Sequence, residues 1–173
     1  MSRLALVRDP RFQKHQTPDA HPETPHRLVA IDNVISRFSL EHGLTELPPR
    51  AAETGQIAAV HKPSYIEELH ENALKLSGEE LIKLDGDTFM GAESFDTALL
   101  ACGAGLVAID AVKGGEVQSA FVAVRRPGHH ALGGKPMGFC LFNNVAVAAR
   151  YAQTRGYQKV FIIDWDLHHG NGT

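Results

Sequence analysis

Two short apolar runs, residues 120–124 and 159–163, limit most strongly what this chain can fold into. Each run is continuous rather than alternating, which is typical of central parallel strands that are buried on both faces. A helical pattern over residues 145–151 lies between them. Strand, helix and strand in this order predict a right-handed crossover unit, in which the segments after the two strands open at the same edge of the sheet.

The rest of the pattern extends this arrangement towards the amino terminus. Residues 4–7 predict a first strand, and residues 9–24 predict a loop because they are rich in proline, histidine and charge. Apolar residues at helical spacing predict a helix that begins at Pro25, and further helices over residues 63–76 and 93–112. In the last of these, Gly103 and Gly105 indicate close packing against a neighbouring element.

Composition excludes several classes of function. With 173 residues, 43% of them hydrophobic, the chain can build one globular domain with a sizeable core. A net charge of −3 gives no basic face for nucleic acid, and no apolar run has the length of a signal peptide or a membrane span. Because Cys102 and Cys140 are too few for a disulfide framework, we expect a reducing, cytoplasmic setting.

The segment that follows the second apolar run carries ligands suited to a metal ion. If its backbone stays extended, Asp164, Asp166 and His168 project to one face, while Trp165 and Leu167 face the other way. Carboxylate oxygen and imidazole nitrogen bind zinc and similar divalent ions, and a catalytic zinc takes three protein ligands and a water. Burying these polar side chains without a metal or hydrogen-bond partners would be costly.

A pair of histidines follows the first apolar run. His129 and His130 could divide the roles of general base and general acid in a metal-assisted hydrolysis, since histidine titrates nearest to neutral pH. Asp164 and Asn171 are candidates to orient the far ring nitrogens, one for each histidine. Taken alone, each motif has an ordinary alternative, because the acids could cap a helix in solvent and the histidines could lie exposed in a loop.

At these segments the chain resembles the histone deacetylase superfamily, nearest its class II and bacterial members. The resemblance rests on three motifs in order, GHHA, MGFCLFNNVAVAA and DWDLHHGNGT, and is extended by HPETPHRL and LDGDTF nearer the start. It implies an α/β fold of the arginase and deacetylase type, with a three-layer, doubly wound, mostly parallel sheet. It also implies a zinc-dependent deacetylase that hydrolyses acetyl-lysine amides.

Carried over by position, the resemblance assigns roles to residues near the predicted metal. Asp166 and His168 match zinc ligands, and His129 and His130 match the tandem acid and base. Asp164 and Asn171 match the residues that support this pair, and Asp164 also matches part of a potassium site.

The resemblance assigns a second set of residues to the substrate. Asp87 matches an acid at the pocket rim that holds the substrate backbone, Gly138 and Phe139 match the wall of an acyl-lysine channel, and Arg27 matches an arginine that lines a cavity behind the metal. The alternatives are a turn for Asp87, ordinary core for Phe139 and a solvated charge for Arg27.

Two departures from the family pattern stand out. Arg126 occupies a position where the resembling proteins usually have proline. The family's third zinc ligand, an aspartate, and its oxyanion-stabilising tyrosine lie downstream of the final motif, and Tyr65, Tyr151 and Tyr157 do not match that tyrosine. We therefore expect residues 1–173 to be the amino-terminal part of a single deacetylase domain, with little or no activity alone.

The expected partners are acetylated lysine in a protein or peptide, or an acetylated polyamine, together with the missing carboxyl-terminal portion or a second copy of the chain. Nucleic acid and membrane are not expected partners. Three other functions stay open at this point: an acetylpolyamine amidohydrolase, a two-metal ureohydrolase and a non-catalytic regulatory fragment.

Overall fold

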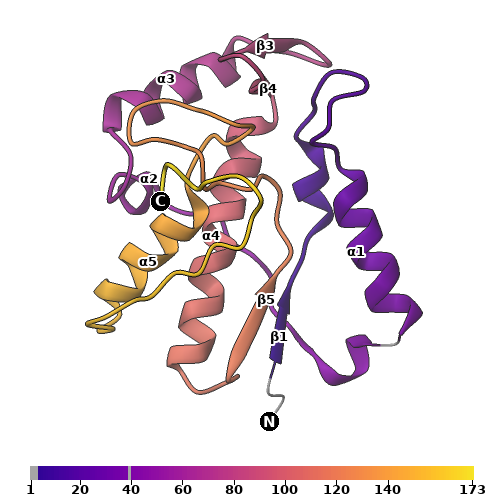
Figure 1. The fold of residues 1–173 in the computed structure, drawn as a ribbon, viewed down its shortest axis with the longest axis vertical. Coiled ribbons are helices and arrows are strands. Elements are labelled where there is room, and N and C mark those ends of the chain that lie inside the picture. The colour runs from indigo at the N-terminus through magenta and orange to yellow at the C-terminus, as the bar shows by residue number, and fades with distance from the viewer. Residues whose placement is uncertain (1–3, 39) are drawn as a thin grey trace.

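The computed structural model describes residues 4–38 and 40–173. Helices and strands alternate along much of the chain, including short strands between the helices that the sequence did not predict (Figure 1). The elements are β1 (Leu4–Val7), η1 (Pro10–Lys14), α1 (His26–Arg37), η2 (Leu40–Gly43), β2 (Thr45–Glu46), α2 (Thr54–Ile57), α3 (Pro63–Leu74), β3 (Leu81–Lys83), β4 (Phe89–Gly91), α4 (Ser94–Lys113), β5 (Ser119–Val122) and α5 (Asn144–Thr154).

A parallel sheet of order β2-β1-β5 forms the middle layer. Helices α4 and α5 lie on one side of it and α1 on the other (Figure 1). Side chains alternate along β1, so Ala5 and Val7 pack in buried clusters with residues of α4, whereas Leu4 and Leu6 face a groove beside α1. The three-layer α/β arrangement predicted from the sequence is confirmed.

Helix α4 is the centre of the core. It carries more buried residues than any other described element and contributes to both larger hydrophobic clusters. Its length and composition would also suit a membrane span, a feature that the sequence analysis did not anticipate. However, 61% of its apolar stretch is buried inside the protein, as in the core helix of a globular domain.

Most predicted elements are confirmed, but the two apolar runs differ from the central strands that were predicted. The first run forms β5, which lies at the edge of the described sheet, with Phe121 48% exposed. Residues 159–163 form no strand, and the side chains of Phe161 and Ile163 are 86% and 69% exposed. The segment is apolar enough for a central strand, but a strand needs a partner ladder of backbone hydrogen bonds, and in the described residues β5 pairs only with β1. A smaller difference is η1, a short turn of helix inside the predicted loop over residues 9–24.

Candidate active site

The two histidine-bearing segments meet, although one of them does not follow a strand. The amide of Gly172 donates to the carbonyl oxygen of His129 at 2.9 Å. The side-chain amide of Asn143 donates to the hydroxyl of Thr173 at 3.1 Å, and also caps α5 by accepting from Ala146. These contacts hold the last residues of the chain against the loop that follows β5.

His129 is paired with the carboxylate of Asp164. The Nδ1 atom of His129 lies 2.8 Å from Oδ2 of Asp164, and His129 is buried at 7% exposure. The hydrogen bond from His129, followed by one from the amide of Asp166, holds the pKa of Asp164 below its ordinary value. A carboxylate can only accept, so Nδ1 of His129 carries a proton and donates this hydrogen bond.

His130 is paired with an amide instead of a carboxylate. Its Nδ1 lies 2.6 Å from Oδ1 of Asn171, and its ring centroid lies 4.1 Å from that of His129. Gly138 leaves space for this ring, because a Cβ at Gly138 would overlap Cδ2 of His130 and lie 2.7 Å from its Cγ. Gly138 also has φ +53°, a conformation that favours glycine.

Asp166 and His168 line the same cavity as the paired histidines. His168 donates from its backbone amide to Oδ1 of Asp166 at 2.7 Å, which lowers the pKa of Asp166, and its Nδ1 lies 3.2 Å from the same oxygen. Both side chains are exposed, so the expectation that polar groups are buried here is wrong: this segment lies on the surface and not inside a sheet. Among the described residues no three His, Cys, Asp or Glu side chains are grouped to hold a metal.

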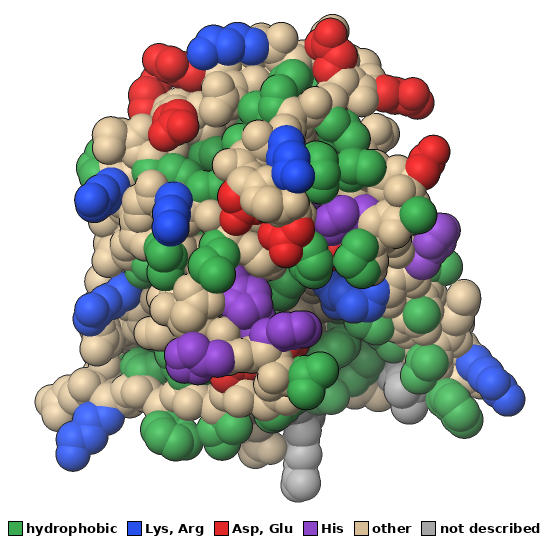
Figure 2. All heavy atoms as spheres, turned by 45° about the horizontal axis from the view of Figure 1, so that its top comes forward, with side chains coloured by type: hydrophobic (Ala, Val, Ile, Leu, Met, Phe, Trp, Pro, Cys, Tyr) green, Lys and Arg blue, Asp and Glu red, His purple; other side chains and the backbone are tan. Residues whose placement is uncertain are grey.

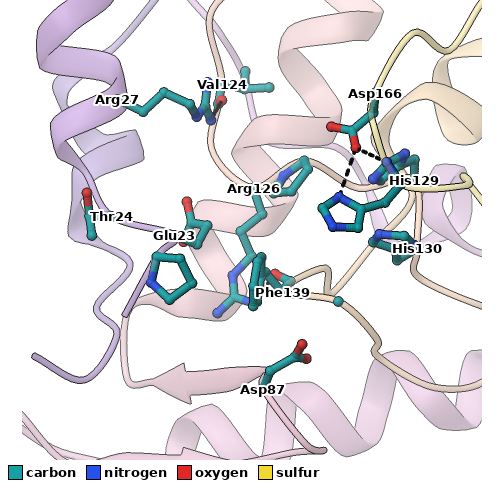
Figure 3. A pocket seen from close by; sticks show the side chains of 14 residues that line it. Glu23, Thr24, Arg27, Asp87, Val124, Arg126, His129, His130, Phe139 and Asp166 are labelled. Carbon is teal, nitrogen blue, oxygen red and sulfur yellow. Dashed lines mark hydrogen bonds and ion pairs between the residues drawn. The ribbon is translucent and has the colours of Figure 1, made fainter. Parts of the chain in front are cut away.

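All four residues predicted to contact substrate line the same cavity, of about 570 Å³. Figure 3 shows Arg27 at one end, Asp87 at the opposite end, and His129, His130 and Asp166 along one side. Figure 2 shows histidine side chains gathered beside a hollow on this face of the molecule. The structure thus brings eight of the predicted site residues to one cavity, and Asp164 and Asn171 contact two of these, His129 and His130, from outside it, while the roles of all ten stay predictions.

The cavity's rim and wall have separate supports. Asp85, not Asp87, makes the turn, because its Oδ1 accepts the amides of Asp87 and Thr88 at 3.1 and 2.8 Å. The hydroxyl of Thr88 accepts the amide of Phe139 at 3.0 Å, and the ring of His21 packs edge-on against Phe139 at 4.8 Å. Asp87 is therefore free of the turn role and faces the cavity.

Arg27 comes to the cavity from the first turn of α1. Its Nη2 donates to the carbonyl oxygen of Val124 at 2.7 Å, across 97 residues of sequence. Burial of the guanidinium lowers the pKa of Arg27, partly opposed by Glu23. Arg27 is an exposed residue, but its guanidinium is held by the carbonyl oxygen of Val124, so it is not a freely solvated charge.

Sequence reasoning missed a buried charge cluster behind the cavity. Arg125 is fully buried and binds Glu23 with two hydrogen bonds, Nε to Oε1 at 2.7 Å and Nη2 to Oε2 at 3.0 Å. Arg126, at 4% exposure, contacts the carbonyl oxygens of Phe89 and Phe139 and the ring of His15. The available signal was the unusual arginine pair before the PGHH motif.

The cluster carries more positive than negative charge. Glu23 faces two buried arginines, and burial lowers the pKa of Arg126 to about 10. The Nε atom of Arg126 is buried without a hydrogen-bond partner in the described part of the chain. Arg126 is buried at the start of the loop that carries the paired histidines. Its guanidinium contacts the backbone of the cavity wall.

His61 is a second residue that sequence reasoning missed. Its Nδ1 lies 3.0 Å from the carbonyl oxygen of Leu132, and its Nε2 accepts the amide of Asn143 at 2.9 Å. His61 therefore holds the two ends of the loop over residues 132–143 together. A lone histidine before Lys62 and Pro63 gave no signal for this, because both of its partners lie more than 70 residues away.

Acid should weaken the fold through His15 and His61. Burial is the main cause that lowers the pKa of both, helped in His15 by the neighbouring arginines, so each ring binds a proton more readily in the unfolded chain. This stability is fully present above the unfolded pKa of about 6.5 and falls as the pH drops below it, by up to about 1.4 kcal/mol per pH unit for each histidine. Between pH 7 and 5.5 we expect the free energy of unfolding in urea to fall by about 2 kcal/mol.

The variant His61→Gln isolates one of these contributions. It should remove roughly half of the pH dependence, since one of the two responsible rings is gone. The exposed His42 provides the matched control, and His42→Gln should leave the pH dependence unchanged. An unaltered pH dependence in His61→Gln would contradict the assignment.

Comparison with known proteins identifies the family. The model of the histone deacetylase domain matches residues 21–173, most of the chain. The chain belongs to the histone deacetylase family. The crystal structure of the HDA15 HD domain superposes on this histone deacetylase family member with a TM-score of 0.92 and 34% identity, over 99% of this chain and 48% of that one. The resemblance read from the motifs and the fold that it implied are both confirmed.

Curated relatives match the same stretch of this histone deacetylase family member. It is 40% identical to the uncharacterized protein slr0245 of Synechocystis sp. over 98% of this chain and 56% of that protein. It is 41% identical to the chloroplastic histone deacetylase 10 of rice and 39% identical to human polyamine deacetylase HDAC10, over 90% of this chain in each case. The chain spans 38% and 24% of the length of the last two, so it corresponds to part of each relative.

Proposed function

We propose that this chain supplies the acid and base residues and two metal ligands of a zinc-dependent deacetylase that hydrolyses acetyl-lysine amides. One observation carries the proposal: two adjacent imidazoles, each held at Nδ1 by a different partner, line one cavity with the carboxylate of Asp166 and the imidazole of His168. This combination suits proton transfer beside a metal ion.

The metal donors fit zinc in kind but are incomplete in number. Asp166 offers oxygen and His168 offers nitrogen, a pair that zinc accepts and that iron or cobalt could also accept without a thiolate. Their mutual contact at 3.2 Å shows that the two side chains reach the same point. When bound, the ion would polarise the acetyl carbonyl and lower the pKa of a water.

The chain's own residues would handle the protons. With Nδ1 engaged by Asp164 or Asn171, each histidine presents Nε2 to the cavity as the atom that gains and loses a proton. The carboxylate of Asp164 stabilises a positive charge on His129 better than the amide of Asn171 does on His130. With their different partners, one ring would accept the proton of the attacking water while the other would protonate the leaving amine.

The cavity wall would align the substrate. The ring of Phe139 offers an apolar surface for an alkyl stem, and Asp87 at the opposite end from Arg27 offers an acceptor for the backbone amides of a peptide or for the ammonium of a polyamine. Because one relative is a polyamine deacetylase, acetylated polyamine is the second candidate substrate.

The test uses a chimera in which this chain is joined at Thr173 to the part of slr0245 that lies outside the matched stretch. With zinc, we expect it to deacetylate an acetyl-lysine peptide, and His130→Ala should reduce turnover at least 100-fold, in the usual range for a lost acid or base. The His42→Ala variant should keep full activity. A folded chimera that binds zinc and hydrolyses neither the peptide nor acetylspermidine would overturn the proposal, and faster turnover of acetylspermidine would select the second candidate.

The 173-residue chain alone should show little or no turnover in the same assay. The described residues provide two metal donors where a catalytic zinc takes three, and they provide no tyrosine at the cavity for the oxyanion. Turnover comparable with that of the chimera would contradict this expectation.

A further inference from the structure

The turn that carries Phe139 has an unusual backbone conformation. Gly138 and Phe139 are its two central residues, and backbone hydrogen bonds of 2.9 and 3.2 Å between Met137 and Cys140 close it. Both central residues have positive φ, +53° and +69°, the combination found in type I′ turns. Of the described non-glycine residues, only Ala20 and Phe139 have a positive φ. An aromatic side chain therefore occupies a position that favours glycine, asparagine or aspartate.

Phenylalanine at this position is strained, and the strain coincides with a place in the cavity. Backbone strain of this kind persists only where the surrounding structure holds it, and it is concentrated at catalytic sites and at sites that grip a ligand. The side chain of Phe139 is half-buried and lines the cavity. Glycine would fit the turn at lower cost, but it would remove this part of the cavity wall.

Three side chains from distant segments hold Phe139. The hydroxyl of Thr88 accepts its amide at 3.0 Å, and the guanidinium of Arg126 donates to its carbonyl oxygen (Figure 3). The ring of His21 packs against the ring of Phe139 at 4.8 Å, with 77° between the ring planes. Thr88 and Arg126 are 0% and 4% exposed, so water does not compete for these two contacts. The amide, the carbonyl and the ring of Phe139 thus each have a partner of their own.

The same residues connect the cavity wall to its rim. The hydroxyl of Thr88 donates to Oδ1 of Asp87 at 3.4 Å, and Nε2 of His21 donates to the carbonyl oxygen of Asp87 at 3.0 Å. The rim and the ring of Phe139 are therefore held in one relative position. The contact from Arg126 is particular to this chain, because the proline that the resembling proteins usually have there has no group to donate.

We propose that Thr88, Arg126 and His21 are positioning residues that keep Phe139 in its left-handed conformation, and that they thereby align the alkyl stem of the substrate in the cavity. They act through the ring of Phe139, which is the surface that the stem contacts. This inference rests on the proposed function for the substrate. The conformation of the turn, however, can be tested without any activity.

The first test uses the 173-residue chain and needs no substrate. Thr88→Val keeps the shape of the side chain but cannot accept the amide of Phe139, whereas Thr88→Ser keeps the oxygen. In Thr88→Val we expect hydrogen exchange at the amide of Phe139 to be faster by about tenfold or more, with exchange in α4 unchanged, because the opening is local. Thr88→Ser should exchange like the parent. Equal exchange in Thr88→Val and the parent would overturn the proposal.

The strain at Phe139 has a separate test by urea unfolding. Phe139→Gly and Phe139→Ala both remove the ring, but only glycine adopts a positive φ without strain. We therefore expect Phe139→Gly to have the higher urea midpoint of the two. An equal or higher midpoint in Phe139→Ala would show that the left-handed conformation is not held in solution, which would overturn the proposal.

The second part of the inference is tested in the chimera with an acetyl-lysine peptide. Thr88→Val and Arg126→Met should each raise KM by about tenfold, in the range for a lost apolar contact in a binding pocket. The kcat should stay within about twofold of the parent, because the ring binds the stem equally in the ground state and the transition state. Thr88→Ser should restore the parent KM. Arg150→Met, which removes an exposed arginine on α5, is the matched control for lost charge and should not change KM.

A double-mutant cycle shows whether Arg126 acts through the ring. Phe139→Ala should raise KM, and adding Arg126→Met should raise it no further, because both changes remove the same contact. Additive increases, or a fall in kcat at constant KM, would overturn the positioning role. A folded chimera that binds zinc and hydrolyses no amide, in a chain whose exchange and unfolding behave as expected, would support the held turn and overturn the proposed function.

Discussion

Replacing Gly103 with alanine should destabilise the protein by about 3 kcal/mol or more, the upper range for overpacking a core. A Cβ at Gly103 would overlap the carbonyl oxygen of Arg50 and lie 2.7 Å from the amide nitrogen of Ala52. Both are backbone atoms, and the amide of Ala52 is already held by the carbonyl oxygen of Leu99 at 2.9 Å. Residues 50–52 pass over α4 at this point, and they cannot move away from the helix without breaking that hydrogen bond.

Gly105, on the same helix, provides the control. A Cβ there would meet only the Cβ of Ala148, at 3.3 Å. The gain in helix propensity, about 1 kcal/mol, should roughly offset this mild crowding, so Gly105→Ala should leave stability within about 1 kcal/mol of the parent. Urea unfolding of the two variants checks the pair, and a Gly103→Ala protein as stable as Gly105→Ala would contradict the packing argument.

Replacing Glu23 with glutamine should cost about 3–5 kcal/mol, the range for removing one partner of a buried ion pair. Glutamine keeps the shape but removes the charge that faces Arg125, which is fully buried, and Arg126, which is 4% exposed. Arginine stays charged at neutral pH, so the variant would bury cations without a counterion. The loss should be measurable as a lower urea midpoint at pH 7.

An exposed ion pair in the same protein gives the comparison. Glu46 contacts Arg8 at 2.5 Å, but its side chain is 55% exposed. Solvent screens such pairs, so Glu46→Gln should change stability by no more than about 1 kcal/mol. Similar losses of stability in Glu23→Gln and Glu46→Gln would contradict the argument that burial makes the Glu23 ion pair contribute more to stability.

The sequence predicted those parts of the fold that depend on local pattern. Apolar spacing gave the helices that became α1, α3, α4 and α5, and a continuous apolar run gave β5. The same reasoning failed at residues 159–163, because a run of apolar residues shows what a segment could bury but not whether a neighbouring strand is present to pair with it.

The candidate site, too, was predicted from the sequence only in part. The HH and DxD motifs were enough to predict that Asp164 and Asn171 would each orient one of the two histidines. The structure decided which, placing Asp164 2.8 Å from His129 and Asn171 2.6 Å from His130. The burial of Glu23 was not predicted, because its partner Arg125 lies 102 residues away and a single glutamate in a polar loop gives no local indication of burial.

By itself, the sequence determined the family, the helices and the residue types gathered at the cavity, since periodicity and motif spacing are local properties that survive without a structure. Only the tertiary structure decided which charges are buried, that His61 and Arg126 support the loop of paired histidines, and that residues 159–167 present an apolar face to solvent. Each of these depends on contacts between distant parts of the chain, which burial and hydrogen-bond geometry select and which local sequence does not specify.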